Sequence, residues 1–268
     1  MTPEPRYLDG PADHGLTFSV CSLVRDGWKY DRLRESFLRC GFTPATTEFL
    51  AADNRSGNRL DGYAWHKALL PEARGRYVIF CHDDVELIEE GAAHLLSCLD
   101  DLDRRDPSWL LAGVAGGLWR AKAQGAPPLA LHISDPFGND RRRGQLPARV
   151  ESLDECFILM RRARPVLSSH DLSGFHFYGP DLCLQAELSG GSAYAIDFHL
   201  RHHGKGVRGP EFRAARRAFI RKYQAFFPGR TLHCTTGSIL LSGQDPDPAS
   251  EAASPEGQTT SPTRPLAR

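Results

Sequence analysis

The sequence predicts a single α/β domain in which a mainly parallel β-sheet is flanked by helices. Apolar runs of strand length alternate with helical segments over the first half of the chain. Repeated strand-then-helix order is typical of parallel strands joined by crossover helices. A chain of 268 residues with 41% hydrophobic residues is long enough to bury one substantial core.

Four strands are expected in the first half. The first is LTFSVCSLV at 16–24 and the second is TTEFLAADN at 46–54. A third lies within RYVIFCHDDVEL at 76–87, and a short fourth is LLAGVAGG at 110–117. The helix after the first strand has an apolar stripe and a glycine at its C-terminus. The stripe residues are Tyr30, Leu33, Phe37 and Leu38, the glycine is Gly41, and further helices are placed near 60–73 and 89–102.

The second half of the chain is less regular. A stretch rich in Gly, Pro and Arg at 121–149 is expected to be a long loop or an antiparallel excursion. In the turn and helix of 175–191, Pro180 suits the first helical turn and Gly190 or Gly191 the C-cap. Strands are expected within 152–162 and 192–206, followed by a basic helix at 211–227.

The two ends differ in composition from the rest. Residues 1–14 are expected to be a flexible N-terminus, residues 15–241 the folded domain, and residues 242–268 a disordered tail. The tail is rich in Pro, Ser, Gly and Thr and has almost no large apolar residues, so it lacks the means to form a core.

Charge and cysteine content narrow the functional classes. Lys plus Arg balance Asp plus Glu at 33 each, which argues against a nucleic-acid-binding protein. No apolar run approaches the ~20 residues that span a bilayer, and the N-terminus does not resemble a signal peptide. Seven cysteines include no CxxC, and four of them lie in apolar segments. We therefore expect core thiols in a cytoplasmic protein.

Polar clusters follow two of the expected strands. His82, Asp83 and Asp84 end the third strand, and Ala52-Asp53-Asn54 ends the second. Ligands of parallel α/β sheets collect beyond the carboxyl ends of the strands. Carboxylates suit Mg²⁺ or Mn²⁺, and imidazole is acceptable to Mn²⁺. A strand that simply reaches water would also end in polar residues.

Two further clusters lie in the second half. His202 and His203 follow a strand, and strand alternation predicts that only one of them faces a site on this edge. Asp181 lies in the first turn of a helix, where the helix dipole favours a carboxylate. It is either a structural residue there or a general base.

Residues 204–209, GKGVRG, match the GxGxxG pattern of dinucleotide-binding proteins. The acidic residue required ~20 positions later is missing, because no Asp or Glu lies between Glu211 and Asp245. The stretch is expected instead to be a flexible loop in which Lys205 and Arg208 contact a phosphate. The basic helix after it offers either a solvated face or contact with an anionic acceptor or membrane surface.

Together, the order and spacing of these motifs over residues 16–206 resemble a family 2-like bacterial glycosyltransferase with the GT-A fold. The resemblance rests on Asp53-Asn54, on the aspartate pair after YVIF, on the DLCLQA helix and on the His-Gly loop. GRYVIFCHDDVEL is similar to the His-x-Asp-Val variant of the Asp-x-Asp motif.

This resemblance implies roles for individual residues. Asp84 and His82 would bind a divalent cation, Mn²⁺ or Mg²⁺, with His202 or His203 as a third ligand or diphosphate contact. Asp181 would be the catalytic base, although Gly179 stands where many family members have the first residue of an acidic pair. The residues assigned to the nucleotide sugar are Asp53, Asn54, Asp83, Asp154 and Lys205.

The sequence thus predicts a cation-assisted, inverting transfer of a sugar from a nucleotide-diphosphate sugar to a hydroxyl of a glycan, lipid-linked or protein acceptor. Peripheral membrane contact would involve the basic helix at 211–227. Two alternatives stay open. One is a metal-dependent phosphohydrolase, which would need two ions ~4 Å apart and more carboxylates. The other is a non-catalytic module that binds sugar nucleotides or glycans, suggested by Gly179.

Overall fold

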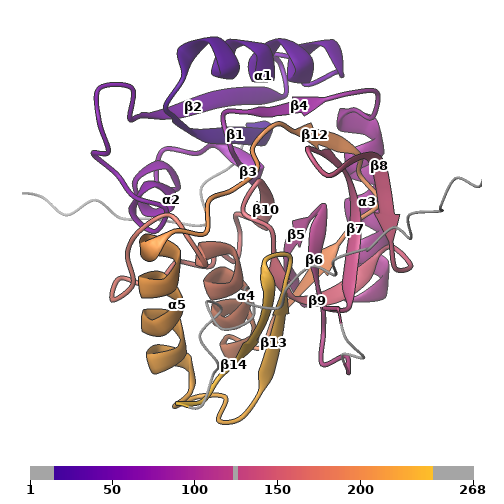
Figure 1. Ribbon diagram of the computed structural model, residues 1–268. Coiled ribbons are helices and arrows are strands. Elements are labelled where there is room, and N and C mark those ends of the chain that lie inside the picture. Colours follow the sequence, from indigo (N-terminus) through magenta and orange to yellow (C-terminus); the bar gives the residue numbers. More distant parts are fainter. Residues whose placement is uncertain (1–14, 123–125, 244–268) are drawn as a thin grey trace, which may run out of the picture.

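A computed structural model describes residues 15–122 and 126–243 (Figure 1). The expectations for residues 1–14 and 244–268 fall outside this part of the chain. Within it, a 12-stranded sheet has the order β2-β1-β3-β10-β5-β11-β9-β6-β7-β12-β4, and β8 pairs with β7. Its first strands are β1 (Leu16–Val24), β2 (Thr47–Asp53), β3 (Gly75–Cys81), β4 (Val85–Leu87), β5 (Trp109–Gly113) and β6 (Ala115–Leu118). The later ones are β7 (Leu129–Asp135), β8 (Gly138–Arg143), β9 (Ala148–Leu153), β10 (Phe157–Arg161), β11 (Ser192–Ala195) and β12 (Leu200–His202).

The expected α/β fold of one domain is confirmed, but the sheet is mixed. Strands β1, β2 and β3 are parallel, as the strand–helix alternation predicts. From β10 onward most neighbours are antiparallel, including β6–β7, β6–β9 and β7–β8. Short connections cannot provide the crossover that a parallel pair needs, so the segment 115–153 folds back on itself. The antiparallel alternative for 121–149 is therefore the correct one.

Helices cover both faces of the sheet. They are α1 (Gly27–Arg39), α2 (Ala64–Leu69), α3 (Ala92–Arg105), α4 (Tyr178–Leu188) and α5 (Pro210–Tyr223). One core cluster joins α1 and α3 to one face, and a second joins α2 and α4 to the other. Alternate residues of β3 pack into different core clusters, since Ile79 belongs to the first cluster and Phe80 to the second.

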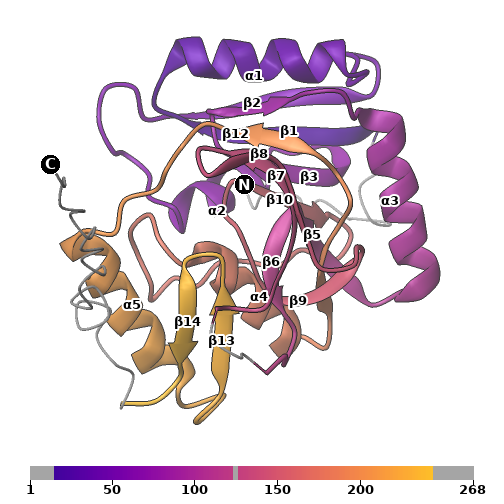
Figure 2. The same ribbon diagram turned by 45° about the vertical axis from the view of Figure 1, so that its right-hand side comes forward.

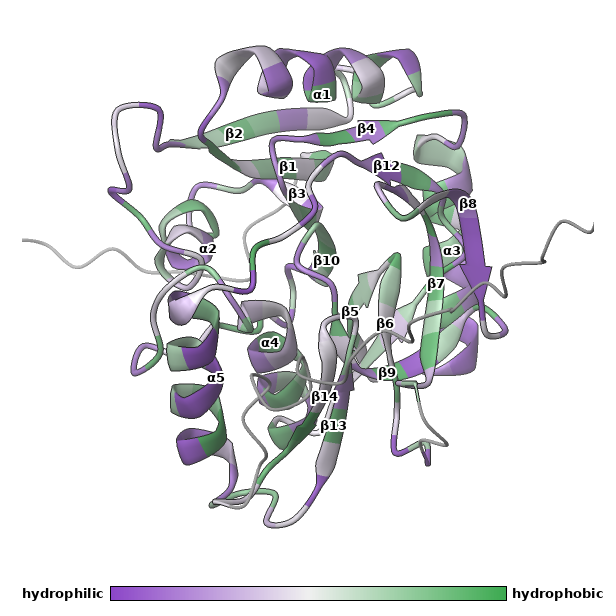
Figure 3. Cartoon of the chain, in the orientation of Figure 1, coloured by the Kyte–Doolittle hydropathy of each residue, from purple (hydrophilic) through white to green (hydrophobic). Residues whose placement is uncertain are grey.

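The sheet curls, so that its far end returns to α1 (Figures 1 and 2). The backbone N–H of Leu87 in β4 donates to Ser36 Oγ of α1 at 3.0 Å, and Arg32 pairs with Glu86 at 2.8 Å. Strand β8, GNDRRR, is hydrophilic and lies off the main path of the sheet (Figure 3). Charged residues on such a strand oppose pairing with another chain.

Several expected boundaries are corrected. The helix expected at 60–73 is reduced to the six residues of α2, and Leu38 of the α1 stripe is exposed. The single strand expected at 152–162 is two strands, β9 and β10, separated by a turn at 154–156. The strand expected at 110–117 is likewise divided, into β5 and β6.

A C-terminal hairpin was not predicted. Its strands β13 (Thr231–Cys234) and β14 (Gly237–Leu240) pack with α5 in a third core cluster (Figure 2). Among the described residues no helix is both long and apolar enough to cross a membrane.

Candidate functional site

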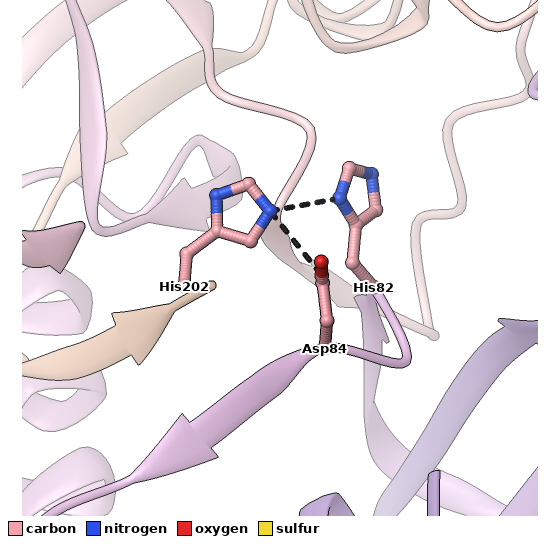
Figure 4. A group of neighbouring side chains, drawn as sticks. All are labelled: His82, Asp84 and His202. Carbon is pink, nitrogen blue, oxygen red and sulfur yellow. Dashed lines mark hydrogen bonds and ion pairs between the residues drawn. The ribbon is translucent and has the colours of Figure 1, made fainter. Parts of the chain in front are cut away.

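Three side chains of types that can bind a metal ion meet where β3 ends. His82 follows β3, Asp84 precedes β4, and His202 ends β12, which pairs antiparallel with β4. His202 Nε2 lies 3.3 Å from Asp84 Oδ1 and 3.3 Å from His82 Nδ1 (Figure 4). The side chains of Asp84 and His202 are each only 15% exposed. The structure thus brings together residues that are 120 positions apart in the sequence.

Tyr178, at the start of α4, fixes the orientation of His82. Its hydroxyl lies 2.7 Å from His82 Nε2, which leaves Nδ1 directed at the cluster. A hydrogen bond on the far nitrogen is the usual way in which a metal-binding histidine is held in one tautomer. Tyr178 therefore has the position of a supporting residue for His82.

Mutual charge stabilises Asp84 and His202 in their ionised forms. Burial acts to raise the pKa of Asp84, but the hydrogen bond from His202 and the charges of His202, His82 and Lys29 lower it to about 2. Burial acts to lower the pKa of His202, but the hydrogen bond to Asp84 and the charges of Asp154 and Asp84 raise it. The cluster therefore holds an ionised carboxylate, and a cation that binds there would displace the proton of His202.

The donor set fits a divalent cation. All three ligand atoms lie within 4.8 Å of one another. Cis ligands of an octahedral ion with bonds of ~2.1 Å lie roughly 3 Å apart, close to the 3.3 Å separations here. Two imidazoles and one carboxylate suit Mn²⁺ better than Mg²⁺. Asp154 and Cys156 also have donor atoms near His202, but Asp154 Oδ2 accepts from Thr235 Oγ1 at 2.7 Å.

The two adjacent histidines point in different directions, as strand alternation predicts. His203 Nε2 lies 3.3 Å from Glu86 Oε2, and its side chain is 43% exposed. It does not belong to the group formed by His82, Asp84 and His202. The expectation that one of the pair faces away thus applies to His203.

Lys205 lies on the loop after β12 and borders a large pocket.

A pocket of about 280 Å³ lies on the α1 side of the cluster. Backbone N–H groups of Arg25 and Asp26 donate to Asp83 Oδ2 at 2.7 and 3.0 Å, so Asp83 holds the loop between β1 and α1. Lys29 and Arg25 add positive charge to this wall. Its lining comprises Leu23, Arg25, Asp26, Lys29, Gly62, Trp65, His82, Asp83, Asp84, Phe175 and Tyr178.

Two residues assigned to the nucleotide are engaged elsewhere. Asn54 is buried and organises the following loop, with contacts to the backbone of Arg59 and Leu60 at 2.7–3.1 Å. Asp53 is ion-paired with Arg55 at 2.9 Å. Neither borders this pocket. In the structure, the polar atoms of both residues serve the 53–60 turn.

A second pocket, of about 740 Å³, lies on the other side of the same cluster. It is bordered by Asp154 and Glu155 from the turn between β9 and β10, and by Phe175 and Phe212. His82 borders both pockets. Strand β10 is antiparallel to β3, so the turn before β10 lies at the carboxyl end of β3. The backbone N–H of His82 accordingly donates to Cys156 O at 3.1 Å.

Glu155 is the carboxyl group that sequence reasoning missed. Burial and the negative charge of Asp154 raise its pKa, while backbone N–H groups of Gly179 and Phe177 hydrogen-bond to it. Phe177 has a positive φ of 66°, unusual for a bulky side chain and worth about 1–3 kcal/mol of strain. Strained backbone therefore contributes to holding Glu155.

The close approach of the Leu153 carbonyl group explains why residue 179 is glycine. A Cβ at this position would lie 2.3 Å from the carbonyl oxygen of Leu153 and 3.3 Å from Glu155 Cγ. An acidic side chain cannot be accommodated at 179 without moving the turn. Glu155, on the neighbouring turn, places a carboxyl group beside this end of α4.

Asp181 does not reach either pocket. Its side chain is completely buried and accepts hydrogen bonds from Ser169 N at 2.8 Å, Ser169 Oγ at 2.5 Å and the Tyr223 hydroxyl at 2.5 Å. A base must approach the proton that it removes. The expected role of Asp181 as catalytic base is therefore corrected to a structural one, joining α4 to α5 and to the 168–169 segment.

Comparison with known proteins gives one close relative. The chain is 58% identical over 243 residues to the ATP synthase subunits region ORF 6 of Fuscovulum blasticum, covering 91% of this chain and 98% of that one. It belongs to the same family as that protein. No family model matches the sequence.

Among solved structures, the fold is similar to crystal structures of S. aureus TarS. A TarS structure in complex with UDP-GlcNAc gives a TM-score of 0.49 at 11% identity, covering 77% of this chain and 65% of that one. The complex of TarS with UDP gives 0.47 at 14% identity, covering 78% and 66%. The match to a further TarS crystal structure covers 78% of this chain but 40% of the TarS chain.

Proposed function

We propose that this protein is a cation-assisted glycosyltransferase that transfers a sugar from a nucleotide-diphosphate sugar to an acceptor hydroxyl. The observation that carries the proposal is the position of His82, which borders both pockets beside Asp84 and His202. A reaction between two substrates needs two binding spaces that meet at the reacting atoms. The cluster lies where two such spaces meet.

The donor would occupy the pocket beside α1. This pocket lies beyond the carboxyl ends of the parallel strands β1 and β3, where nucleotides bind in α/β sheets. Arg25 and Lys29 provide positive charge for phosphates, and Phe175 offers an aromatic face. A cation held by His82, Asp84 and His202 would offset the negative charge of the departing diphosphate.

The acceptor would occupy the larger pocket. Glu155 would take the proton from the acceptor hydroxyl as the oxygen attacks the sugar, which inverts the anomeric centre in a single displacement. Lys205, on the edge of this pocket, would contact the diphosphate or the acceptor. The donor sugar would span the cluster between the two spaces.

Thermal unfolding with a panel of nucleotide sugars, with and without Mn²⁺, tests donor binding. A donor at 100 times its dissociation constant should stabilise the protein by about 2.7 kcal/mol. We expect Asp84→Asn to lose the Mn²⁺-dependent part of this shift and at least tenfold of the transfer rate. Asp101→Asn, the same change on the surface of α3, should match the wild type.

The outcomes separate the alternatives. If no nucleotide sugar raises the melting temperature with either Mn²⁺ or Mg²⁺, the proposal is wrong. Phosphate release without any sugar transfer would favour the phosphohydrolase. Donor binding with no turnover in any acceptor screen would favour the binding module.

A further inference from the structure

A second group of metal-binding side chains lies on the opposite face of β7. Leu131, Ile133 and Asp135 of this strand border the large pocket, so His132 and Ser134 between them face the other way. His132 is completely buried. The group formed by His132, Asp140 and His199 has ligand atoms within 4.8 Å of one another. The glycosyltransferase chemistry proposed above uses none of the three.

His132 is held between two carboxylates. Its Nδ1 lies 2.6 Å from Asp197 Oδ1 and its Nε2 lies 2.9 Å from Asp140 Oδ1. A buried imidazole whose far nitrogen is bound by a carboxylate is the common arrangement behind a metal-binding histidine. Asp197 has that position, because it contacts Nδ1 and leaves Nε2 directed toward Asp140.

His199 completes the group from another segment. Its ring stacks on that of His132 at 4.4 Å with an interplanar angle of 7°. Its Nε2 lies 2.9 Å from Ser134 Oγ, which also accepts from the backbone N–H of Asp140 at 2.9 Å. Ser134 thus fixes both His199 and Asp140 beside His132.

Asp140 has an unusual backbone. Its φ is +42°, in a region that non-glycine residues seldom adopt. Its side chain is 62% exposed, so an ion could reach the buried His132 from solvent. Arg142 lies 3.3 Å from Asp140 and 3.4 Å from Asp197, where it balances their charge when no ion is bound.

We propose that His132 Nε2, Asp140 and His199 bind a divalent transition-metal ion, with Zn²⁺ favoured by two imidazoles and one carboxylate. Binding replaces the proton between His132 Nε2 and Asp140, and that proton is released to solvent. A water molecule would fill the fourth position of a tetrahedral ion.

Such an ion would tie β7 and β8 to the segment that leads into β12. His199 lies immediately before β12, and His202 at the end of this strand belongs to the first cluster. The ion would therefore stabilise the strand that positions His202. Its role would be structural, and it would take no part in sugar transfer. The inference holds whether or not the protein transfers sugar.

Counting bound Zn²⁺ by equilibrium dialysis tests the site. His202 is common to the other two groups of metal-binding residues found in the described chain, so His202→Gln weakens both. We expect the His202→Gln protein to bind one Zn²⁺ and to gain melting temperature with it. Adding Asp140→Asn should abolish both effects, since asparagine tolerates the positive φ but removes the carboxylate.

Two further variants complete the experiment. His199→Gln in the same background should also lower Zn²⁺ affinity at least tenfold, while Asp101→Asn on α3 should leave it unchanged. Equal Zn²⁺ binding with and without the Asp140 carboxylate would overturn the proposal, as would no binding by the His202→Gln protein at all.

Discussion

Three carboxyl groups near α4 and the adjoining turn have the same chemistry but different surroundings. Asp181 is saturated with hydrogen bonds from Ser169 and Tyr223 and is removed from solvent. Asp154 accepts from Thr235 and from the backbone N–H of Cys156. Glu155 alone combines a place on the pocket wall with a raised pKa. At the scale of single residues, the surroundings and not the residue type decide which carboxyl group can act as a base.

A pair of substitutions separates these roles. Glu155→Gln should lower the transfer rate by about 10²–10⁴-fold without lowering the melting temperature, because a general base contributes about that factor. Asp181→Asn should cost about 1–3 kcal/mol of folding stability and leave the rate per folded molecule nearly unchanged. Steady-state kinetics and denaturant unfolding on both variants check this. A larger rate loss in Asp181→Asn than in Glu155→Gln would indicate that Asp181 is the base.

The raised pKa of Glu155 gives the pH dependence of this prediction. The folded protein retains the proton above the usual range for a glutamate, so folding stability falls as pH rises through that interval. Transfer should rise toward the upper end of this interval, near the pKa of about 8 that Glu155 has in the folded protein, because the base must be ionised. In Glu155→Gln this part of the stability profile should flatten, which a series of melting curves across pH will show.

Tyr178 offers a test of how His82 is held. Tyr178→Phe removes the hydroxyl that lies 2.7 Å from His82 Nε2 and keeps the aromatic packing. Loss of such a supporting contact typically costs 10–100-fold in metal affinity. Titration with Mn²⁺ by calorimetry measures it, with Tyr30→Phe on α1 as the matched control. Equal Mn²⁺ affinity in the two variants would show that the Tyr178 hydroxyl does not support His82 as a metal ligand.

At the scale of elements, the position of α4 depends on a close approach to the turn between β9 and β10. Gly179 lies against the carbonyl oxygen of Leu153 with no room for a Cβ. Motifs that end a predicted strand were located correctly from the sequence, as Asp84 shows. The turn that carries Glu155 is not predicted from the sequence, because SLDECFILMRR has the pattern of one continuous strand.

Gly179→Ala should therefore move this turn. The clash with backbone atoms should lower folding stability by about 1–3 kcal/mol and displace Glu155, so the transfer rate should fall as well. Gly190→Ala, at the other end of α4, is a useful comparison: it has open space but a φ of +74°, so it should affect stability and not the rate. Unfolding and kinetic measurements on both test the assignment. An unaltered rate in Gly179→Ala would contradict it.

At the scale of the whole molecule, buried charge attaches the C-terminal hairpin to the sheet. Glu151 of β9 is buried and accepts from His233 N at 2.7 Å and from Arg230 at 3.0 Å. Arg230 also pairs with Glu187 of α4 at 2.8 Å. The hairpin carries Thr235 next to the large pocket, so these ion pairs connect the hairpin to the site.

Glu151→Gln should weaken this attachment. The loss of a buried charged partner should cost about 1.5–3 kcal/mol, measured by denaturant unfolding. Glu187→Gln acts on the same arginine from a more exposed position and should cost less. The reverse order of the two effects would show that the hairpin is held mainly by its apolar contacts.

Sequence patterns predict the α/β class, the parallel strands β1–β3, the buried thiols of four cysteines, and the polar residues at the strand ends. Local periodicity and strand-end chemistry are encoded within a few consecutive residues, so these features can be read without a structure. Tertiary structure alone decided that β10 runs antiparallel to β3, that Glu155 and not Asp181 borders the pocket, and that His132 meets Asp140 and His199. Each depends on which distant segments pair and in which direction, and strand pairing is set by packing across the whole sheet.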